Sequence, residues 1–378
     1  MSEPKKNVLH LMSWFPRPGQ PLSGNFCLKH IRSVSDDVNS IVLSAYVDDN
    51  VKKREVEIVE HANFKQVYVH IPTSALPSSI RLFHAYNWGL KYIKKHFFNP
   101  DLVHLHVALP LGRVALYWRK RFGLKYVMTE HWTIYQPQNA KEMTPKVQRL
   151  IRSIANHAEV ILPVSCDLQK NMQHYGITRP FRCIPNVVDT AIFHPIVKAP
   201  HEKKRLLHIS TLRDAAKNFS GIVRVVEKLS KQRQDFVLDV VNDFENPSAA
   251  RYVSEHHLED FVVFHGKKEE NEITDFYKNS DFFVLFSNFE NLPCVIIESF
   301  ACGLPVITTD VGGICEMMDD TRGVTLHAGD EDALLHAINH LLDHYQEFDF
   351  QQIKEYAENH FSMPVIGAQL LQVYNGIQ

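Results

Sequence analysis

Long apolar runs are missing from this sequence of 378 residues, and their absence excludes the simplest membrane-spanning architectures. A helix needs about 20 consecutive apolar residues to cross a bilayer, and no stretch approaches that length. The N-terminal stretch MSEPKKNVLHLM also lacks the apolar core and cleavage site of a secretory signal. Both absences lead us to expect a protein of the cytoplasm.

Cysteine is scarce and forms no recognisable metal or redox pattern. The six cysteines include no CxxC pair and lie mostly in apolar or helical surroundings, so we expect reduced, buried thiols. His104 and His106 alternate on one face of an expected strand, but no carboxylate or cysteine follows at ligand spacing. We favour structural histidines there, with a metal site as the alternative.

Net charge is small, but the two halves of the chain differ strongly. Residues 1–195 carry 25 Lys and Arg against 14 Asp and Glu, whereas the remainder carries 16 against 29. Two explanations stay open. Oppositely charged domains could face each other across a cleft, or the basic half could contact an anionic surface such as a membrane leaflet. Basic clusters with aromatic neighbours lie around Lys91–Lys95 and around Tyr117–Lys125.

What the sequence does contain is a long βαβ pattern at residues 281–317. Two continuous apolar runs, 281–286 and 305–308, flank a helix expected from Pro293 to Cys302. This spacing predicts a right-handed parallel unit, whose ligand would sit outside the carboxyl ends of the strands. The polar turn between strand and helix is therefore the first place to look for a site.

That turn suits an anion. Pro293 is expected at the first helical position, where its missing N–H costs nothing, and the free N–H groups of the first turn would face a phosphate. Glu290 precedes the helix and Glu298 lies about two turns into it. A carboxylate accepts two hydrogen bonds in one plane, which fits vicinal sugar hydroxyls. The pattern indicates a nucleotide sugar, although either Glu could instead be a solvated surface residue.

Strand and helix patterns alternate along the whole chain, with a strand also expected at 181–185. Between His194 and Lys204 the composition turns to Pro, Lys and Glu, as in linkers. We therefore expect a domain boundary there, with one domain at 1–195 and another from 196 onward.

Several segments together resemble the retaining glycosyltransferases of family 4, also called glycosyl transferases group 1. Glu290 and Glu298, followed by SFACGLPVITTDVGG, are similar to the E-x7-E signature of that family. TEHW at 129–132 resembles its T-x-H segment, and NVVDTAIFHP its hinge. The stretch SWFPRPGQPLSGNF resembles a version found in many bacterial members. The resemblance implies the GT-B fold: α/β, with two Rossmann-like parallel-sheet domains facing across a cleft. It also implies an acceptor-binding domain at 1–195, a nucleotide-sugar-binding domain at 196–360, and a last helix at 361–378 that crosses back to the first domain.

The resemblance also assigns roles to individual residues. The catalytic residues would be His131, Lys217, Arg213 and Glu290. The donor-binding residues would be Gly24, Gly266, Asn291, Leu292, Pro293, Cys294 and Glu298. Arg213 departs from the family pattern, because it lies four rather than five residues before Lys217 and the usual Gly is absent. No D-x-D stands where it could hold a metal-bound diphosphate, so neither a metal nor another cofactor is expected.

The implied activity is the transfer of a hexose-type sugar from a UDP-, GDP- or ADP-sugar to a glycan or lipid-linked acceptor, with retention of configuration. The use would be cell-surface polysaccharide biosynthesis at the inner face of the membrane, with peripheral contact through the basic first domain and no nucleic acid. Two alternatives are a nucleotide-sugar epimerase, which would form product without an acceptor, and a non-catalytic binding protein of the same fold.

Overall fold

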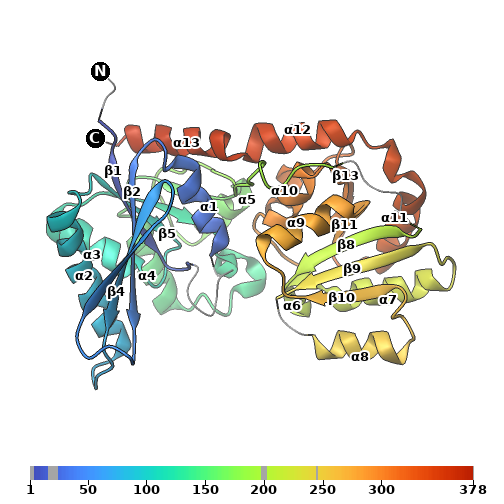
Figure 1. Ribbon diagram of the computed structural model, residues 1–378, viewed down its shortest axis with the longest axis horizontal. Coiled ribbons are helices and arrows are strands. Elements are labelled where there is room, and N and C mark those ends of the chain that lie inside the picture. Colours follow the sequence, from blue (N-terminus) through green and yellow to red (C-terminus); the bar gives the residue numbers. More distant parts are fainter. Residues whose placement is uncertain (1–3, 16–23, 197–201, 244–245, 378) are drawn as a thin grey trace. The chain divides into compact units, whose positions relative to one another are not determined.

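Two β-sheets organise the chain in the computed structural model, which describes residues 4–15, 24–196, 202–243 and 246–377 (Figure 1). The residues group into two compact units, one formed by 1–185 with 363–378 and the other by 186–362. Each unit is a largely parallel sheet with helices on both faces, which is how alternating strands and helices bury their apolar sides. The predicted α/β class with two Rossmann-like halves is confirmed.

The first unit contains a seven-stranded sheet of order β3-β4-β2-β1-β5-β6-β7. Its strands are β1 (Asn7–Met12), β2 (Asn39–Val47), β3 (Glu55–Glu60), β4 (Phe64–Ile71), β5 (Leu102–His106), β6 (Tyr126–Glu130) and β7 (Ile161–Pro163). Its helices are α1 (Asn25–Val34), α2 (Ser78–His96), α3 (Gly112–Phe122), η1 (Thr133–Tyr135), η2 (Pro137–Asn139), α4 (Pro145–Ala155), α5 (Cys166–His174) and α13 (Met363–Asn375).

Strand β3 is the one antiparallel member of this sheet, and the sequence pattern did not predict it. It pairs with β4 at the sheet edge, and most of its side chains are exposed. Its sequence, EVEIVE, is half glutamate, so it lacks the continuous apolar run that marks a buried strand. Charges of this kind at an edge discourage pairing with another chain.

The second unit contains a six-stranded sheet of order β10-β9-β8-β11-β12-β13, parallel throughout. Its strands are β8 (Lys204–Ser210), β9 (Phe236–Asn242), β10 (Val262–Gly266), β11 (Phe282–Leu285), β12 (Val306–Thr309) and β13 (Gly323–Leu326). Its helices are α6 (Asp214–Lys217), α7 (Phe219–Ser230), α8 (Pro247–Glu255), α9 (Glu270–Asn279), α10 (Cys294–Ala301), η3 (Gly312–Glu316), α11 (Glu331–His344), η4 (Tyr345–Glu347) and α12 (Phe350–Phe361).

The last helix, α13, belongs to the first unit and packs closely on α1. The two backbones approach so tightly at Gly367 that an added Cβ would lie 1.9 Å from the carbonyl oxygen of Ser33. The Lys6 ammonium also donates to the carbonyls of Tyr374 and Ile377, at 2.6 and 2.7 Å. The C-terminal segment is therefore an integral part of the first unit.

Residues 186–195, assigned to the first domain from sequence, group with the second unit. The Asn186 side chain donates to the Leu292 carbonyl at 2.6 Å, and Val188 forms a bridge with Ser362. The strand expected at 181–185 is wrong, since only Phe181 makes a single bridge, to Ile161. The amides of Arg182 and Ile184 donate to Ile161 and Pro163 of β7, but Pro163 has no N–H to donate in return. The expected linker at 194–204 lies partly outside the described residues.

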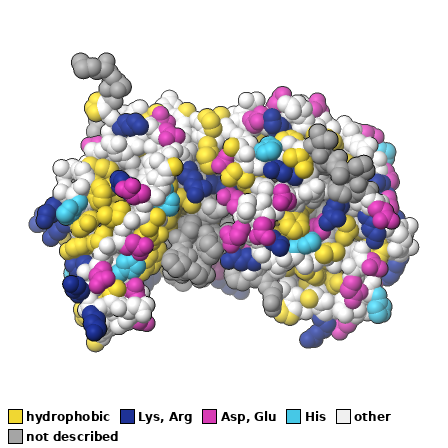
Figure 2. Space-filling model, viewed as in Figure 1, with side chains coloured by type: hydrophobic (Ala, Val, Ile, Leu, Met, Phe, Trp, Pro, Cys, Tyr) yellow, Lys and Arg dark blue, Asp and Glu magenta, His cyan; other side chains and the backbone are white. Residues whose placement is uncertain are grey.

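The surface corrects two further expectations. Trp118, expected among the aromatic side chains at a basic surface, is fully buried and donates to Asn87 at 2.9 Å. Cys166 and Cys315 are exposed rather than buried. On the face shown in Figure 2, hydrophobic side chains gather over the first unit around β2 and β4, and Asp and Glu are distributed over both units. Among the helices that the structure describes, none has both the length and the apolarity to traverse a bilayer.

Candidate functional site

The turn between β11 and α10 is held in place by the loops beside it. The Asn288 amide donates to the Ala216 carbonyl at 2.7 Å, and the Thr309 hydroxyl donates to the Ser287 carbonyl at 2.7 Å. Gly312 has φ +57°, and a Cβ there would lie 2.0 Å from the Glu290 carbonyl oxygen. Only glycine allows this approach, so the turn after β12 braces the turn after β11.

Helix α10 begins one residue later than the sequence indicates. Pro293 is the N-cap residue, with φ −70° and ψ 121°, and Cys294 is the first helical residue. No side chain caps this end, and the start of a helix is a place where backbone N–H groups commonly bind anions. The expectation that Pro293 occupies the first helical position is therefore corrected, while an anion-binding role for residues 291–294 stays a prediction.

Lys217 and Glu290 form an ion pair, although they are distant in sequence. Lys217 ends the short helix α6 after β8, and Glu290 lies in the turn after β11. Their side chains are 19% and 8% exposed, so both charges are largely removed from water. The Ser287 hydroxyl also donates to Glu290 at 2.8 Å. Since β8 and β11 are neighbours in the sheet, the pair lies at the carboxyl ends of adjacent parallel strands.

Arg213 precedes Lys217 by one helical turn but lies in a different environment. It is the N-cap residue of α6 and its side chain is exposed, whereas Lys217 is half-buried. Both belong to the segment that follows β8, where Leu212 and Asn218 have positive φ. A strained loop of non-glycine residues is held by its surroundings and is frequent at functional sites.

Glu298 lies on α10 with its side chain buried, rather than on the exposed face expected of an ordinary helical glutamate. The Tyr277 hydroxyl donates to its carboxylate, with an O···O distance of 3.1 Å. Burial and the neighbouring Glu298 carboxylate raise the pKa of Tyr277 far above its usual value, so the phenol stays a donor. Because a carboxylate accepts about four hydrogen bonds, this contact is compatible with ligand binding.

Gly266, the remaining predicted donor-binding residue of the second unit, ends β10 beside a register shift in its pairing with β9. Its φ is +65°, and an added Cβ would meet no atom within 4 Å. The positive φ, and not a close contact, is thus the reason for glycine at this position. The space beside Gly266 could therefore accommodate a ligand. Next to it, His265 contacts Asp239 at 2.7 Å.

The predicted site residues of the first unit form a separate group. His131 follows β6 and contacts the rings of Phe26 and His30, with centroid distances of 4.6 and 5.2 Å. Gly24 begins α1 with φ +70°, where a Cβ would lie 2.3 Å from the Trp14 carbonyl oxygen. Residues 16–23 of the expected glycine-containing turn lie outside the described residues.

Sequence reasoning missed Glu130, which fixes the loop that carries His131. Its buried carboxylate accepts from the backbone amides of Ala108, His131 and Trp132 at 2.9–3.1 Å, and from the Tyr135 hydroxyl. Burial raises the pKa of Glu130, while these donors act in the opposite direction. The sequence signal that could have identified Glu130 was its position as a carboxyl residue at the very end of a buried strand.

The structure therefore brings Lys217 into contact with Glu290 in the second unit, and Glu290 shortly precedes α10 in the sequence. His131 and Gly24 lie in the first unit. Among the described residues, clusters of three or more metal-ligating side chains occur in the first unit and not around Lys217 and Glu290. The predicted site residues of the second unit include the cation of Lys217, the carboxylates of Glu290 and Glu298, and the start of α10. Such a set can bind an anion and a hydroxylated ligand together.

Comparison with known proteins gives a consistent result. Residues 40–192 match the model of "Glycosyltransferase Family 4", and residues 189–360 match that of "Glycosyl transferases group 1". The chain is 28% identical over 233 residues to N-acetyl-alpha-D-glucosaminyl L-malate synthase of Bacillus anthracis, covering 58% of this chain and 59% of the relative. It is 25% identical over 258 residues to the putative teichuronic acid biosynthesis glycosyltransferase TuaC of Bacillus subtilis, covering 66% and 63%.

These alignments span less than two-thirds of the length of the curated relatives. Among solved structures, HepE of Anabaena in complex with UDP-glucose superposes with a TM-score of 0.74 at 16% identity, covering 98% of this chain and 99% of that one. The shared fold is the GT-B arrangement of two Rossmann-like halves. With two adjoining family matches and this fold, the chain belongs to the glycosyl transferases group 1, or family 4, proteins.

Proposed function

We propose that this protein transfers a hexose-type sugar from a nucleotide-sugar donor to a glycan or lipid-linked acceptor, with retention of the anomeric configuration. The observation that carries the proposal is the Lys217–Glu290 pair at the carboxyl ends of β8 and β11, beside the uncapped α10. Support comes from HepE, which was solved with UDP-glucose. The donor could carry UDP, GDP or ADP.

The roles follow from the chemistry of the bond that breaks. Cleavage of a sugar–phosphate bond places negative charge on the departing diphosphate and positive charge on the anomeric carbon. Lys217, Arg213 and the backbone N–H groups of Asn291, Leu292 and Cys294 would stabilise the diphosphate, and each such donor typically contributes about 3 kcal/mol in the transition state. Because these cations and amides can neutralise the leaving group, we propose that no metal or other cofactor takes part.

The carboxylates would orient the donor. Glu290 would accept from sugar hydroxyls once the ligand competes for Lys217, Glu298 would accept from the ribose, and Gly266 would border the base. In the first unit, His131 would contact the transferred sugar or the acceptor, and Gly24 would let the backbone approach the ligand. Glu130 acts on His131 by holding its loop, so it is a positioning residue.

A thermal-shift screen against UDP, GDP, ADP and their common sugar conjugates, with chelator present, tests donor binding. A ligand that binds only the folded chain raises its unfolding temperature by mass action. We expect a shift with one nucleotide series, and a smaller shift in Glu298→Gln. If a well-folded sample responds to none of the nucleotides, the donor site is refuted.

A turnover assay then separates transfer from the alternatives. With the identified donor, release of nucleoside diphosphate should require an acceptor, and the anomeric configuration of the product should match that of the donor by NMR. A new sugar isomer formed without acceptor would instead indicate an epimerase. Binding without any turnover across an acceptor panel would indicate a non-catalytic protein.

We also propose that the protein acts in the cytoplasm in cell-surface polysaccharide biosynthesis, in peripheral contact with the inner face of the membrane. Ile80 and Phe122 in the basic first unit are 45% and 49% exposed, and the last turns of α2 and α3 carry Lys94, Lys95 and Arg119–Arg121. TuaC, named for teichuronic acid biosynthesis, supports the polysaccharide role. Flotation with anionic liposomes at low salt, and its loss at high salt, is the expected result; no flotation under either condition would refute membrane contact.

A further inference from the structure

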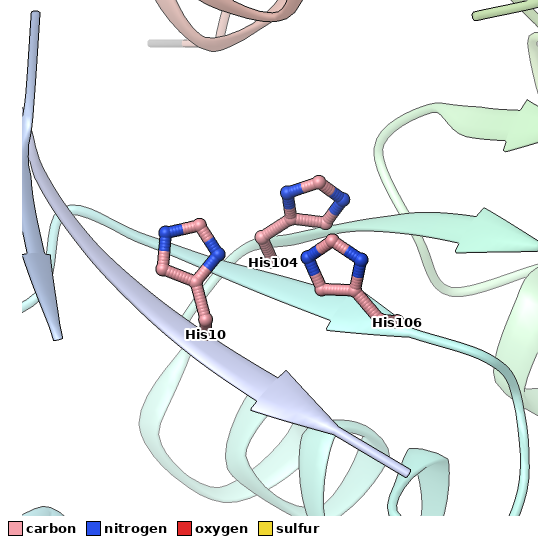
Figure 3. Close-up of side chains that lie close together, drawn as sticks. All are labelled: His10, His104 and His106. Atoms are coloured by element: carbon pink, nitrogen blue, oxygen red, sulfur yellow. The ribbon is translucent and has the colours of Figure 1, made fainter. Parts of the chain in front are cut away.

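Three buried histidines meet on one face of the first sheet (Figure 3). His10 lies on β1, and His104 and His106 lie on the adjacent parallel strand β5. The register pairs His10 with His104, and residues two apart on a strand share a face, so His106 lies on the same side. All three side chains are fully buried, and one ligand nitrogen of each lies within 4.8 Å of the other two.

Their hydrogen bonding is incomplete. Within the described structure, neither ring nitrogen of His106 has a hydrogen-bond partner, and Nδ1 of His10 has none. By contrast, both nitrogens of His208, the buried histidine of β8, are hydrogen-bonded. A buried polar atom without a partner costs about 1–3 kcal/mol, so an accumulation of three such atoms calls for a compensating group.

A proton is a poor candidate for that group. A protonated ring would be a fully buried charge, and burial disfavours the charged form of all three histidines. Neutral imidazole, with a lone pair on an unprotonated nitrogen, is the form that coordinates metal ions.

We propose that His10, His104 and His106 bind a single divalent transition-metal ion of the Zn²⁺ type as a structural site of the first unit. Three imidazoles suit Zn²⁺, Co²⁺, Ni²⁺ or Cu²⁺, and a hard cation such as Mg²⁺ would instead require oxygen ligands. A Zn–N distance of about 2.0 Å implies ligand nitrogens roughly 3.3 Å apart in a tetrahedron, so the rings must turn slightly inward.

His104 also has the outer contacts that a metal-bound histidine requires. Its Nδ1 lies 2.6 Å from the Tyr374 hydroxyl of α13, and its Nε2 lies 2.7 Å from the Thr129 hydroxyl of β6. One contact would give way to the metal, and the other would orient the ring. The ion would thereby link β1 and β5 directly, and β6 or α13 through the remaining hydrogen bond of His104. These links would stabilise the first unit.

A second possible group, Cys27, His106 and His131, shares His106 with the first. We assign the ion to the first group because all three of its members are fully buried and because His131 is already assigned to the transfer reaction. The two arrangements are separable by experiment. Loss of His10 removes a ligand from the first group alone, and Cys27→Ser removes one from the second alone.

Metal content of the purified full-length chain tests the proposal. Since the chain has 22 histidines, surface-bound metal must first be stripped with a weak chelating resin. Elemental mass spectrometry should then show about one retained ion per chain, as for a site buried during folding. His10→Asn and His106→Asn should lose this ion, whereas Cys27→Ser and His336→Ala, an exposed histidine of α11, should keep it.

A spectroscopic readout on the unmodified protein covers the case in which a ligand variant fails to fold. Denaturation with chelator and refolding with Co²⁺ should give the intense visible bands of four-coordinate cobalt and a higher unfolding temperature than refolding without metal. Wild-type protein that holds no more metal than His10→Asn, or a cobalt spectrum like that of the hydrated ion, overturns the proposal. In either case the histidines would be satisfied by buried water.

Discussion

Glu290 holds a nearly buried carboxylate against the ammonium of Lys217, so each charge depends on the other for compensation. We expect Lys217→Met to destabilise the protein by about 2 kcal/mol, less than for a fully buried pair because Lys217 keeps some solvent contact. The double variant with Glu290→Gln should regain part of this loss, since no unpaired charge remains. Transfer activity should be lost in Lys217→Met and should stay lost in the double variant. Denaturant unfolding and initial-rate assays measure the two effects.

Arg213→Met is the matched control for this pair, because Arg213 is exposed on the same short helix. It should leave the free energy of unfolding within about 0.5 kcal/mol of the wild type. Equal destabilisation by Arg213→Met and Lys217→Met would show that the ion pair has no special role. Unaltered transfer rates in Lys217→Met would remove Lys217 from the site.

His208 gives a prediction about pH. Burial lowers its pKa from 6.5 to about 4. Between these values the unfolded chain binds a proton that the folded chain does not, so the free energy of unfolding falls as the pH is lowered through this window. The contribution of one histidine is about 1.4 kcal/mol per pH unit. In His208→Gln this part of the slope should vanish, as measured by denaturant unfolding at several pH values; an unchanged slope would contradict the assignment.

At the scale of elements, the contact between α1 and α13 decides whether the C-terminal helix stays docked. Gly367→Ala should destabilise the first unit by about 3 kcal/mol, since a Cβ 1.9 Å from the Ser33 carbonyl forces two backbones apart. Gly376→Ala is the control in the same segment, because its nearest atoms lie at 3.5 Å. Thermal unfolding of both variants measures the difference, and equal unfolding temperatures would show that the helices separate without cost.

At the scale of the whole molecule, the two units can be observed separately. All four tryptophans, Trp14, Trp88, Trp118 and Trp132, lie in the first unit, so their fluorescence reports its unfolding alone. If the units unfold independently, a nucleotide bound by the second unit should raise the calorimetric transition of that unit and leave the fluorescence transition unchanged. A ligand-induced shift of both transitions by the same amount would instead show that the units unfold together.

The sequence determined the features that depend on neighbouring residues. Continuous apolar runs alternating with helical patterns indicated two parallel-sheet halves, and the turn at 287–292 with Glu290 and Glu298 indicated a binding region. The predicted start of α10 at Pro293 was one residue too early, because the end of a helix depends on backbone angles that several sequences allow. Strand β3 escaped prediction because an edge strand needs no apolar run.

Tertiary structure alone decided which distant residues meet. Lys217 and Glu290 are 73 positions apart, and only the pairing of β8 with β11 brings them into contact. His104 and His106 are visible as an alternating pair in the sequence, but the third histidine comes from β1, through a register that no local pattern encodes. Likewise, residues 186–195 join the second unit through hydrogen bonds to Leu292 and Phe361. Local periodicity follows from adjacent side chains, whereas register and long-range contacts follow from how whole elements pack.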